Sequence, residues 1–253
     1  MVLAIEIARE AGALLRERAA DAPRGVSAKS SRTDQVSDAD RAAEAFIVSR
    51  IRAAQPRDGI VAEEGGGGGA GTSGLTWFVD PLDGTANYLY GAPHWAVSIC
   101  CEDATGPIAG AVYDPMRDEL FAAERNGGAF LGARRLGVRR AGDLATALVA
   151  TGFSYDARER DKQAAVAARM AGRIRDFRRS GSAALDLAWV AAGRLDAYCE
   201  VMRSPWDWSA GALLVGEAGG RISWTAHQEI VASGPGLHDA LIALLQDAHE
   251  IRG

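Results

Sequence analysis

Two aspartates, Asp80 and Asp83, are the side chains best placed to do chemistry in this chain. They lie in the segment 77–88, WFVDPLDGTANY, after a short apolar run with β character. Pro81 removes a backbone donor, so the strand over 75–79 is expected to end there and to leave Asp80 at its carboxyl end. Mg²⁺ is usually shared between a few carboxylates and the phosphate oxygens of a substrate. The spacing therefore predicts a metal and phosphate site.

The two residues that follow, Gly84 and Thr85, extend this hypothesis. They can open a helix whose first amide groups face an anion, where the helix dipole also favours negative charge. The alternative is a polar turn after a strand, since Asp, Pro and Gly dominate turns for backbone reasons. An isolated DPxDG segment leaves both interpretations open, and the rest of the chain has to decide between them.

Length, composition and charge exclude several classes of protein. The chain has 253 residues, 48% of them hydrophobic, which is enough to bury a full core. A net charge of −5 argues against a nucleic-acid surface, which normally carries a basic excess. The longest apolar runs are too short to span a membrane. The expected first helix carries acidic residues within its apolar run, and a signal peptide does not. We therefore expect a cytoplasmic protein without nucleic-acid or membrane partners.

The cysteines and the apolar periodicity predict a layered α/β protein. Cys100, Cys101 and Cys199 lie in apolar runs without metal-ligand spacing, so we expect small core residues. The segment 94–131 alternates β runs with turn residues, which predicts an antiparallel meander. Later elements alternate between helix and strand, which is typical of α/β layers. We expect helices at 2–19, 40–54, 157–172, 183–192, 207–217 and 236–249, and strands at 174–178, 195–200, 220–224 and 229–233.

Four segments together resemble the inositol monophosphatase family, which belongs to a superfamily of lithium-sensitive, magnesium-dependent phosphatases that includes fructose-1,6-bisphosphatase. The segment 77–88 is similar to its first signature, and VAEEG at 61–65 resembles its paired-glutamate motif. KSSRTDQVSDAD at 29–40 resembles the family's Lys…Asp-x-Val-Thr-x-x-Asp stretch. PWDWSAGALLVGEAGG at 205–220 resembles its second signature. The four segments occur in the family's order and cover nearly the whole chain.

The resemblance implies a fold and an activity. It implies an αβαβα sandwich of the sugar-phosphatase type, formed by residues 1–253 as a single domain. Residues 1–140 would form a metal- and phosphate-binding half and residues 141–253 a substrate-recognition half. The activity implied is that of a phosphoric monoester hydrolase that uses two or three Mg²⁺ ions, with Mn²⁺ as a substitute. Such an enzyme would be inhibited by lithium, and we expect it to be a homodimer.

The resemblance also implies a set of metal ligands. Glu63, Asp80 and the backbone carbonyl of Leu82 would hold a first ion that acidifies a water molecule. Asp80, Asp83 and Asp207 would hold a second ion, which would stabilise the leaving alkoxide. A third ion would lie near Glu63. Electrostatics agrees with this assignment, because four converging acids repel one another strongly unless cations join them.

Catalytic and substrate roles follow by the same resemblance. Thr85 would activate the attacking water and Asp40 would accept its hydroxyl proton, although Thr85 can also be a helix cap. Gly84 and Thr85 would offer amides to the phosphate, and Lys29 would approach the water or balance Glu63. The leaving group would contact Ser182, Ala183 and Glu200.

The substrate itself stays open at this stage. Inositol monophosphate or a related polyol phosphate is the leading expectation, hydrolysed by direct attack of a metal-activated water. Histidinol phosphate, fructose 1,6-bisphosphate, adenosine 3′,5′-bisphosphate and NADP remain alternatives, since the motifs describe the phosphate end. A different class of function, a non-catalytic regulatory module on the same fold, would not need every ligand together with the water activator.

Three places depart from the family pattern: Ala62, where glycine is usual before the paired glutamates, residues 203–205, which match no family consensus, and a glycine run. Residues 65–74 contain seven glycines in ten positions, between Glu63 and the strand that delivers Asp80. The run lacks the Gly-Lys-Ser/Thr ending of a nucleotide-binding loop. We therefore expect a mobile connection, held only by metal, substrate or a neighbouring subunit, with Glu63 as the least ordered ligand.

Overall fold

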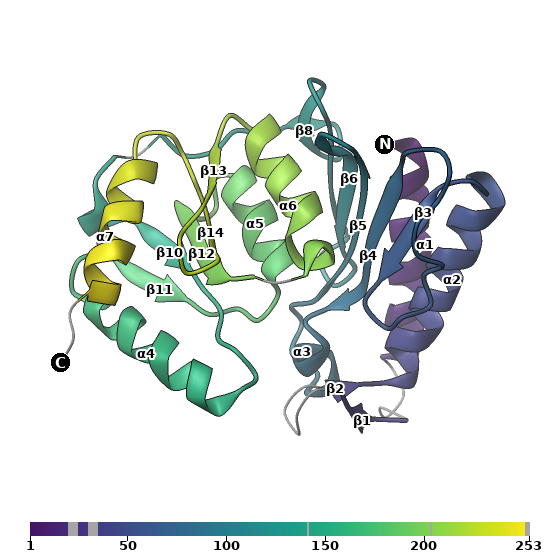
Figure 1. The fold of residues 1–253 in the computed structure, drawn as a ribbon, viewed down its shortest axis with the longest axis horizontal. Coiled ribbons are helices and arrows are strands. Elements are labelled where there is room, and N and C mark those ends of the chain that lie inside the picture. The colour runs from purple at the N-terminus through teal and green to yellow at the C-terminus, as the bar shows by residue number, and fades with distance from the viewer. Residues whose placement is uncertain (20–24, 30–34, 141, 203, 251–253) are drawn as a thin grey trace.

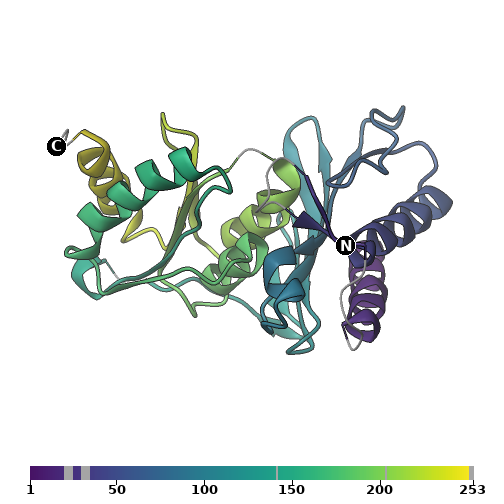
Figure 2. The same cartoon turned by 90° about the horizontal axis from the view of Figure 1, so that it is seen from below.

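Five layers of helix and sheet make up the protein (Figures 1 and 2). The computed structural model describes residues 1–19, 25–29, 35–140, 142–202 and 204–250. Helices α1 and α2 cover the outer face of a seven-stranded sheet, and α5 and α6 lie between it and a five-stranded sheet. Helices α4 and α7 cover the remaining face. This is the αβαβα sandwich expected from the sequence.

The helices begin and end close to where periodicity places them. Ser37 caps α2, where its side chain accepts a hydrogen bond from the amide of Ala39 while Asp40 accepts one from the amide of Ser37. This capping box fixes the first turn of α2. The helices are α1 (Val2–Arg18), α2 (Asp38–Ala54), α3 (Thr85–Leu89), α4 (Ala157–Ala171), α5 (Ala183–Ala191), α6 (Pro205–Glu217) and α7 (His238–Glu250), with a 3₁₀ turn at Leu144–Thr146.

The seven-stranded sheet has the order β3-β4-β5-β6-β7-β8-β9. It is antiparallel except where β3 pairs with β4 in parallel, so the meander expected over 94–131 is confirmed. Its strands are β3 (Gly59–Ala62), β4 (Thr76–Asp83), β5 (Ala96–Asp103), β6 (Gly106–Asp114), β7 (Glu119–Glu124), β8 (Gly128–Leu131) and β9 (Arg134–Arg135). A separate short pair joins β1 (Ser27–Ala28) to β2 (Gln35–Val36).

The five-stranded sheet has the order β11-β10-β12-β14-β13. Strand β10 lies between β11 and β12 and is parallel to both, whereas β14 is antiparallel to its neighbours. The strands are β10 (Leu148–Ala150), β11 (Asp176–Arg178), β12 (Ala197–Val201), β13 (Arg221–Trp224) and β14 (Glu229–Ser233). The carboxyl ends of β10 and β12 therefore meet at one edge, close to the start of α5.

The largest hydrophobic core joins the two sheets through α5 and α6. It includes Val112 and Phe121 from the first sheet and Tyr198 and Ile230 from the second, all fully buried. The central helices approach each other closely, because a Cβ at Gly211 would lie 2.5 Å from the Leu187 side chain. The shared core holds the ends of β4 and β12 on a common side of the molecule.

One expectation about side chains is confirmed at this level. Cys100, Cys101 and Cys199 are buried free thiols. Among the described residues, no helix has the length and apolar character that crossing a membrane requires.

Two expectations are wrong. The strand over 75–79 does not stop at Pro81: β4 continues to Asp83, and its pairing with β5 shifts register between Asp80 and Asp83. One extra residue is accommodated there as a β-bulge, which takes Pro81 out of the ladder.

The glycine segment 65–74 is also held within the chain. Gly69 and Ile60 exchange backbone hydrogen bonds of 3.0 and 3.1 Å, and Thr72 donates to the carbonyl of Arg57 at 2.7 Å. A Cβ at Gly67 would lie 2.4 Å from the Ile60 carbonyl oxygen, so glycine permits the close packing. Backbone contacts replace the metal, substrate or subunit that we expected to be needed.

Candidate active site

The bulge at the end of β4 places two carboxylates on one cavity. Asp80 is 2% exposed, and its carboxylate accepts a hydrogen bond of 2.9 Å from the amide of Leu82. Asp83, three residues later, remains partly open to the cavity. The bulge turns both side chains toward the same space, because it re-aims the strand between them.

Gly84 makes the connection from strand to helix possible. Its φ of +96° lies in the left-handed region, and α3 begins at the next residue, Thr85. A Cβ at Gly84 would also lie 3.1 Å from the carbonyl oxygen of Gly181 and from that of His94. Both the φ angle and the close approach favour glycine here, and they confirm that a helix starts at Thr85.

Thr85 and Asp40 form the pair that the sequence predicts. The Thr85 hydroxyl donates to Asp40 at 2.9 Å and lies 3.1 Å from the Leu82 carbonyl oxygen. Asp40 is fully buried and also accepts from the amide and hydroxyl of Ser37. The carboxylate of Asp40 is therefore fixed, and it orients the hydroxyl of Thr85.

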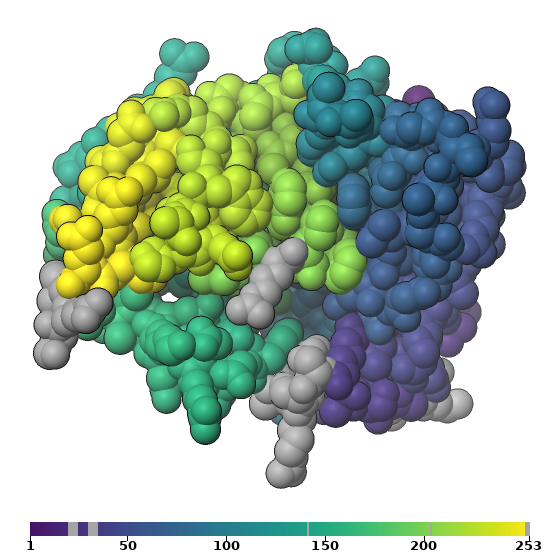
Figure 3. Space-filling model, viewed as in Figure 1, coloured from purple at the N-terminus to yellow at the C-terminus, as the bar shows by residue number. Residues whose placement is uncertain are grey.

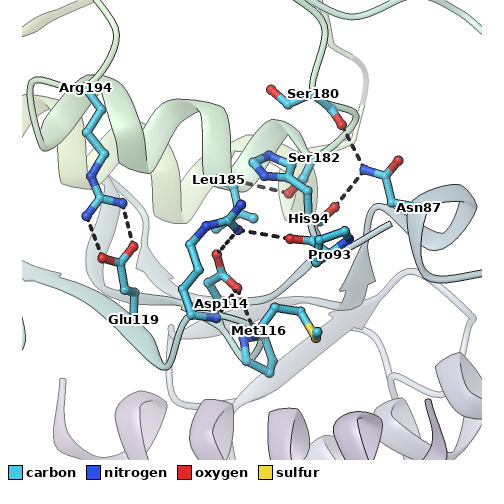
Figure 4. Close-up of polar contacts among 12 residues, drawn as sticks. Asn87, Pro93, His94, Asp114, Met116, Glu119, Ser180, Ser182, Leu185 and Arg194 are labelled. Atoms are coloured by element: carbon cyan, nitrogen blue, oxygen red, sulfur yellow. Dashed lines mark hydrogen bonds and ion pairs between the residues drawn. The ribbon is translucent and has the colours of Figure 1, made fainter. Parts of the chain in front are cut away.

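Asp83 is held by the second half of the chain. Its carboxylate accepts hydrogen bonds of 2.5 Å from the Ser182 hydroxyl and 2.7 Å from the amide of Ala184, at the start of α5. Figure 4 shows Asn87 between His94 and Ser180. The Asn87 amide donates to both carbonyl oxygens, at 2.7 and 2.8 Å. Side chains from both halves therefore connect the start of α5 to the end of β4.

Asp207 reaches the cavity from the first turn of α6. Pro205 is the first residue of this helix, where a missing amide hydrogen removes no helical bond. The hydroxyl of Ser98, on β5, donates to the Trp206 carbonyl at 3.2 Å and holds this turn against the first sheet. Asp207 therefore lies in the same cavity as Asp80 and Asp83.

The paired glutamates after β3 both form ion pairs with one lysine. Lys29 donates to Glu63 at 2.8 Å and forms an ion pair with Glu64 as well. Burial acts to lower the pKa of Lys29, but the two glutamates together raise it above its ordinary value. Lys29 therefore lies against Glu63 as the expected charge balance requires, and its role in the site stays a prediction. Glu44, on α2, accepts from the amides of Glu64 and Gly66, both at 2.6 Å, and holds the turn.

Burial and mutual repulsion raise the pKa values of the clustered acids. Burial raises the pKa of Asp80 well above its usual range, and neighbouring carboxylates add to the effect. The pKa of Asp207 is raised for the same reasons. Burial raises the pKa of Asp83 to about 6, against the opposing effect of hydrogen bonds from Ser182 and Ala184. A cation bound between these carboxylates would therefore stabilise their ionised forms.

The donor chemistry of this cluster fits a hard cation. Asp80, Asp83, Asp207 and Glu63 present carboxylate oxygens to one cavity, and Mg²⁺ prefers such ligands. Within the ranges that the structure describes, no group of three or more acid, histidine or cysteine side chains is arranged to hold a metal ion. Lys29 supplies positive charge beside Glu63 in this arrangement. The residues therefore fit a hard cation in the type of their donor atoms.

Glu200 is a buried acid with a raised pKa. Burial raises its pKa to about 7, although a hydrogen bond of 2.6 Å from the Tyr198 hydroxyl opposes the rise. A Cβ at Gly152 would lie 2.0 Å from a Glu200 carboxylate oxygen, so the carboxylate rests against backbone. Near neutral pH Glu200 is partly protonated and can both donate to and accept from hydroxyl groups.

The cavity has a volume of about 350 Å³ and collects almost all of the predicted residues. Asp40 lies behind Thr85 rather than in the lining. Asp34, in the segment 29–40, and Arg203, shortly before the segment 205–220, fall outside the described residues. The lining includes Lys29, Glu63, Asp80, Leu82, Asp83, Gly84, Thr85, Ser182, Ala183, Glu200 and Asp207.

Supporting residues were missed from the sequence. Glu44, Asn87 and Tyr198 fix the turn, the half-to-half contact and the Glu200 carboxyl. Each lies on an ordinary helix or strand position, so its type alone gave no signal. Asp186, on α5, was given no role in the site from the sequence; it is 2% exposed, lines the cavity and accepts a hydrogen bond from the Ser180 hydroxyl.

Comparisons with known proteins agree with this geometry. A sequence model described as the inositol monophosphatase family matches residues 1–250. The Nus factor SuhB of Escherichia coli strain K12 is 40% identical over 254 residues, covering 97% of this chain and 95% of the relative. The inositol-1-monophosphatase of Mycobacterium bovis is 40% identical over 267 residues, covering 96% and 92%.

Solved structures give the same result. The extragenic suppressor protein suhB of Bartonella henselae superposes with a TM-score of 0.90 at 35% identity, covering 99% of this chain and 98% of that one. The inositol monophosphatase of Anabaena superposes with a TM-score of 0.87 at 37% identity, covering 98% and 95%. Sequence and fold agree over the full length, and the chain belongs to the inositol monophosphatase family.

Proposed function

We propose that this protein is a Mg²⁺-dependent phosphoric monoester hydrolase that acts on inositol monophosphate or a related polyol phosphate. The observation that carries the proposal is the Thr85 and Asp40 hydrogen bond of 2.9 Å, placed beside the carboxylates of the cavity. A hydroxyl with a dedicated proton acceptor, next to a cation site, is what hydrolysis by water requires. The names of the M. bovis and Anabaena relatives favour inositol.

The water-activating role belongs to Thr85 and Asp40. Because the Thr85 hydroxyl donates its proton to Asp40, its oxygen is left to accept a hydrogen bond from a water molecule. That hydrogen bond would orient the water and draw its proton away as the oxygen attacks phosphorus. The amides of Gly84 and Thr85, at the start of α3, would hold phosphate oxygens in line with the water.

Two groups of ligands would hold the metal. Glu63, Asp80 and the Leu82 carbonyl would form one, and Asp80, Asp83 and Asp207 the other, with a third ion near Glu63. Bound Mg²⁺, or Mn²⁺ in its place, would supply positive charge for the phosphate oxygens and acidify a water molecule. Lys29 would have to yield part of its contact with Glu63 when the ion enters.

The leaving group would contact the second half of the chain. Ser182 and Ala183 open α5 beside Asp83, and Glu200 ends β12 on the same cavity. A partly protonated carboxyl at Glu200 suits a polyol, since hydroxyl groups donate and accept. Histidinol phosphate, fructose 1,6-bisphosphate and adenosine 3′,5′-bisphosphate are the alternative substrates for the same site.

Phosphate release from a panel of phosphomonoesters tests this proposal. We expect activity with Mg²⁺, its loss in EDTA and its return when Mg²⁺ is restored, with inhibition by lithium. Asp207→Asn should lower turnover on every substrate, whereas Glu200→Ala should change the preference among leaving groups. Full activity of metal-stripped enzyme would overturn the mechanism, and an equal loss on all substrates in Glu200→Ala would overturn the leaving-group role.

A second candidate function comes from the E. coli relative that is named as a Nus factor. A regulatory module on this fold would work through partner proteins and would not depend on phosphate release. Inactivity of the purified wild-type protein on the whole panel, with Mg²⁺ present, would favour this candidate. We propose a homodimer in either case, and light scattering would show twice the chain mass of 26.6 kDa.

A further inference from the structure

A second and larger cavity lies beneath α4. Its volume is about 640 Å³, against about 350 Å³ for the catalytic cavity. The space-filling view shows a hollow between the teal α4 and the yellow C-terminal elements (Figure 3). We call it the α4 cavity. Its lining mixes polar and apolar side chains, and the apolar ones include Val166 and Met170 of α4, Phe177 of β11, Cys199 of β12 and Leu245 of α7.

The α4 cavity is continuous with the catalytic cavity. Gly152, Glu200 and Asp207 line both of them. Glu200 stands at their common wall, where the missing side chain of Gly152 leaves room for its carboxylate. A leaving group held near Glu200 would therefore have the α4 cavity directly beyond it.

The far end of the α4 cavity presents flat rings. The imidazoles of His227 and His249 are stacked with centroids 3.8 Å apart and planes inclined by 15°. His249 also lies 2.9 Å from the Glu229 carboxylate, which fixes the ring. Stacked or edge contacts with such rings favour a planar aromatic group over an aliphatic one.

The lining suits two other occupants less well. A bare polyol could pair with polar lining residues such as Gln163 and Gln228, but it would leave the apolar walls at Met170 and Phe177 unfilled. A second phosphate would need cations. Among the lining residues that the structure describes, Lys162 is the one lysine or arginine, and it is paired with Glu159 at 2.7 Å.

We propose that the α4 cavity is an extension of the substrate site that binds a planar aromatic group carried by the hydroxyl-bearing leaving group. The proposal rests on the function proposed above and specifies its substrate class: aryl-bearing polyol monophosphates. The volume of the α4 cavity agrees with this proposal, since small-molecule sites are typically cavities of about 300–1,000 Å³.

The test compares myo-inositol 1-phosphate with its set of mono-O-benzyl ethers. At least one ether should show kcat/KM roughly tenfold or more above the parent, because its ring would be buried in an apolar pocket. Ala167→Phe narrows the α4 cavity from α4 and should abolish this gain while leaving the parent compound unchanged. Ala167→Leu is a milder second variant in case the first folds poorly.

Ala165→Phe is the matched control, because Ala165 is exposed on the opposite side of α4 and does not line the cavity. It should keep the preference for the ether. Binding of the phosphate-free benzyl ether to metal-free protein, measured by calorimetry, should weaken in Ala167→Phe and not in Ala165→Phe.

The outcomes separate the two proposals. Hydrolysis of none of these compounds would overturn the proposed function. Hydrolysis of the parent with no ether preferred, or an equal effect of Ala167→Phe on ether and parent, would overturn the aromatic subsite and leave the phosphatase proposal standing.

Discussion

The hydroxyl of Thr85 is the smallest unit on which the proposed chemistry depends. Its proton is committed to Asp40 at 2.9 Å, so Thr85→Ala removes the group that would orient the water. We expect turnover to fall by about 10²–10⁴, the usual range for a proton-handling group. Metal binding should be nearly unchanged, as Mg²⁺ titration by calorimetry would show. Thr85→Ser keeps the hydroxyl and should retain most activity; if it is as inactive as Thr85→Ala, the hydroxyl is not the cause.

Glu200 makes stability depend on pH. Its pKa rises from 4.5 unfolded to about 7 folded, so the folded state binds the proton more tightly. The contribution of Glu200 to the free energy of unfolding is therefore complete below pH 4.5 and is lost as pH rises through 7. Glu200→Gln mimics the neutral form and should raise the free energy of unfolding in EDTA at pH 8 by on the order of 2 kcal/mol more than at pH 5.

Urea denaturation at the two pH values measures this difference. Glu124→Gln, at an exposed glutamate on β7, is the control and should show no such dependence. An equal effect of Glu200→Gln at pH 5 and pH 8 would mean that Glu200 is ionised throughout.

The site residues that lie in sequence motifs could be predicted from the sequence, whereas the residues that hold them in place could not. Asp80, Asp83 and Thr85 stand in an unusual string of acids, proline and glycine, and such strings carry chemical meaning. Glu44 and Asn87 support the site through hydrogen bonds to residues 20 or more positions away, Glu64 and Ser180. Such a bond depends on which strands and helices become neighbours, which no local pattern specifies.

At the scale of elements, the turn after β3 shows how a helix can position a metal ligand. Glu44 is 3% exposed, and its two oxygens accept from the amides of Glu64 and Gly66, both at 2.6 Å. These bonds fix the backbone that carries Glu63. The turn is therefore preorganised by α2, rather than by the metal that we expected to be needed.

Glu44→Gln tests this arrangement. A glutamine places one NH₂ group against a backbone amide, so one of the two bonds is lost. We expect Mg²⁺ affinity to fall by about tenfold, the scale seen for partners of metal ligands, while the circular dichroism spectrum is unchanged. Glu17→Gln, on the exposed face of α1, is the control. Unchanged Mg²⁺ affinity in Glu44→Gln would show that the turn holds itself.

Element prediction succeeded where periodicity was long. Helices of 13 to 17 residues such as α1, α2 and α4 were placed within two residues of their bounds. Strands β3 and β10, of four and three residues, were not expected from the sequence. The glycine segment was misjudged for a different reason: backbone pairing with Ile60 depends on β3, which was not expected.

At the scale of the whole molecule, the site exists only where the two halves meet. Asp83 of the first half is held by Ser182 and Ala184 of the second. Figure 4 shows further contacts across the same boundary, including the Arg194 and Glu119 ion pair. The separation into a phosphate half and a leaving-group half stays a prediction, but the contacts show that neither could form the cavity alone.

The acid cluster should make the stability of the whole protein depend jointly on pH and metal. The folded pKa values of Asp83, at about 6, and Glu64, at about 7, lie above their ordinary values, as do those of Asp80 and Asp207. For each group, stability is full below the unfolded pKa and falls as pH rises through the folded one. In EDTA the free energy of unfolding should therefore decrease from pH 5 to pH 8.

Mg²⁺ should reverse that decrease, because it binds the ionised cluster of the folded state alone. At a hundredfold excess over its dissociation constant, an ion adds about 2.7 kcal/mol, or several degrees in Tm for a chain of this size. Asp207→Asn removes one charge, so it should be more stable than wild type in EDTA at pH 8 and should gain less from Mg²⁺. Thermal denaturation with and without Mg²⁺ measures both effects. Equal Mg²⁺ gains in the two proteins, or stability in EDTA that increases with pH, would show that these acids do not share a cation.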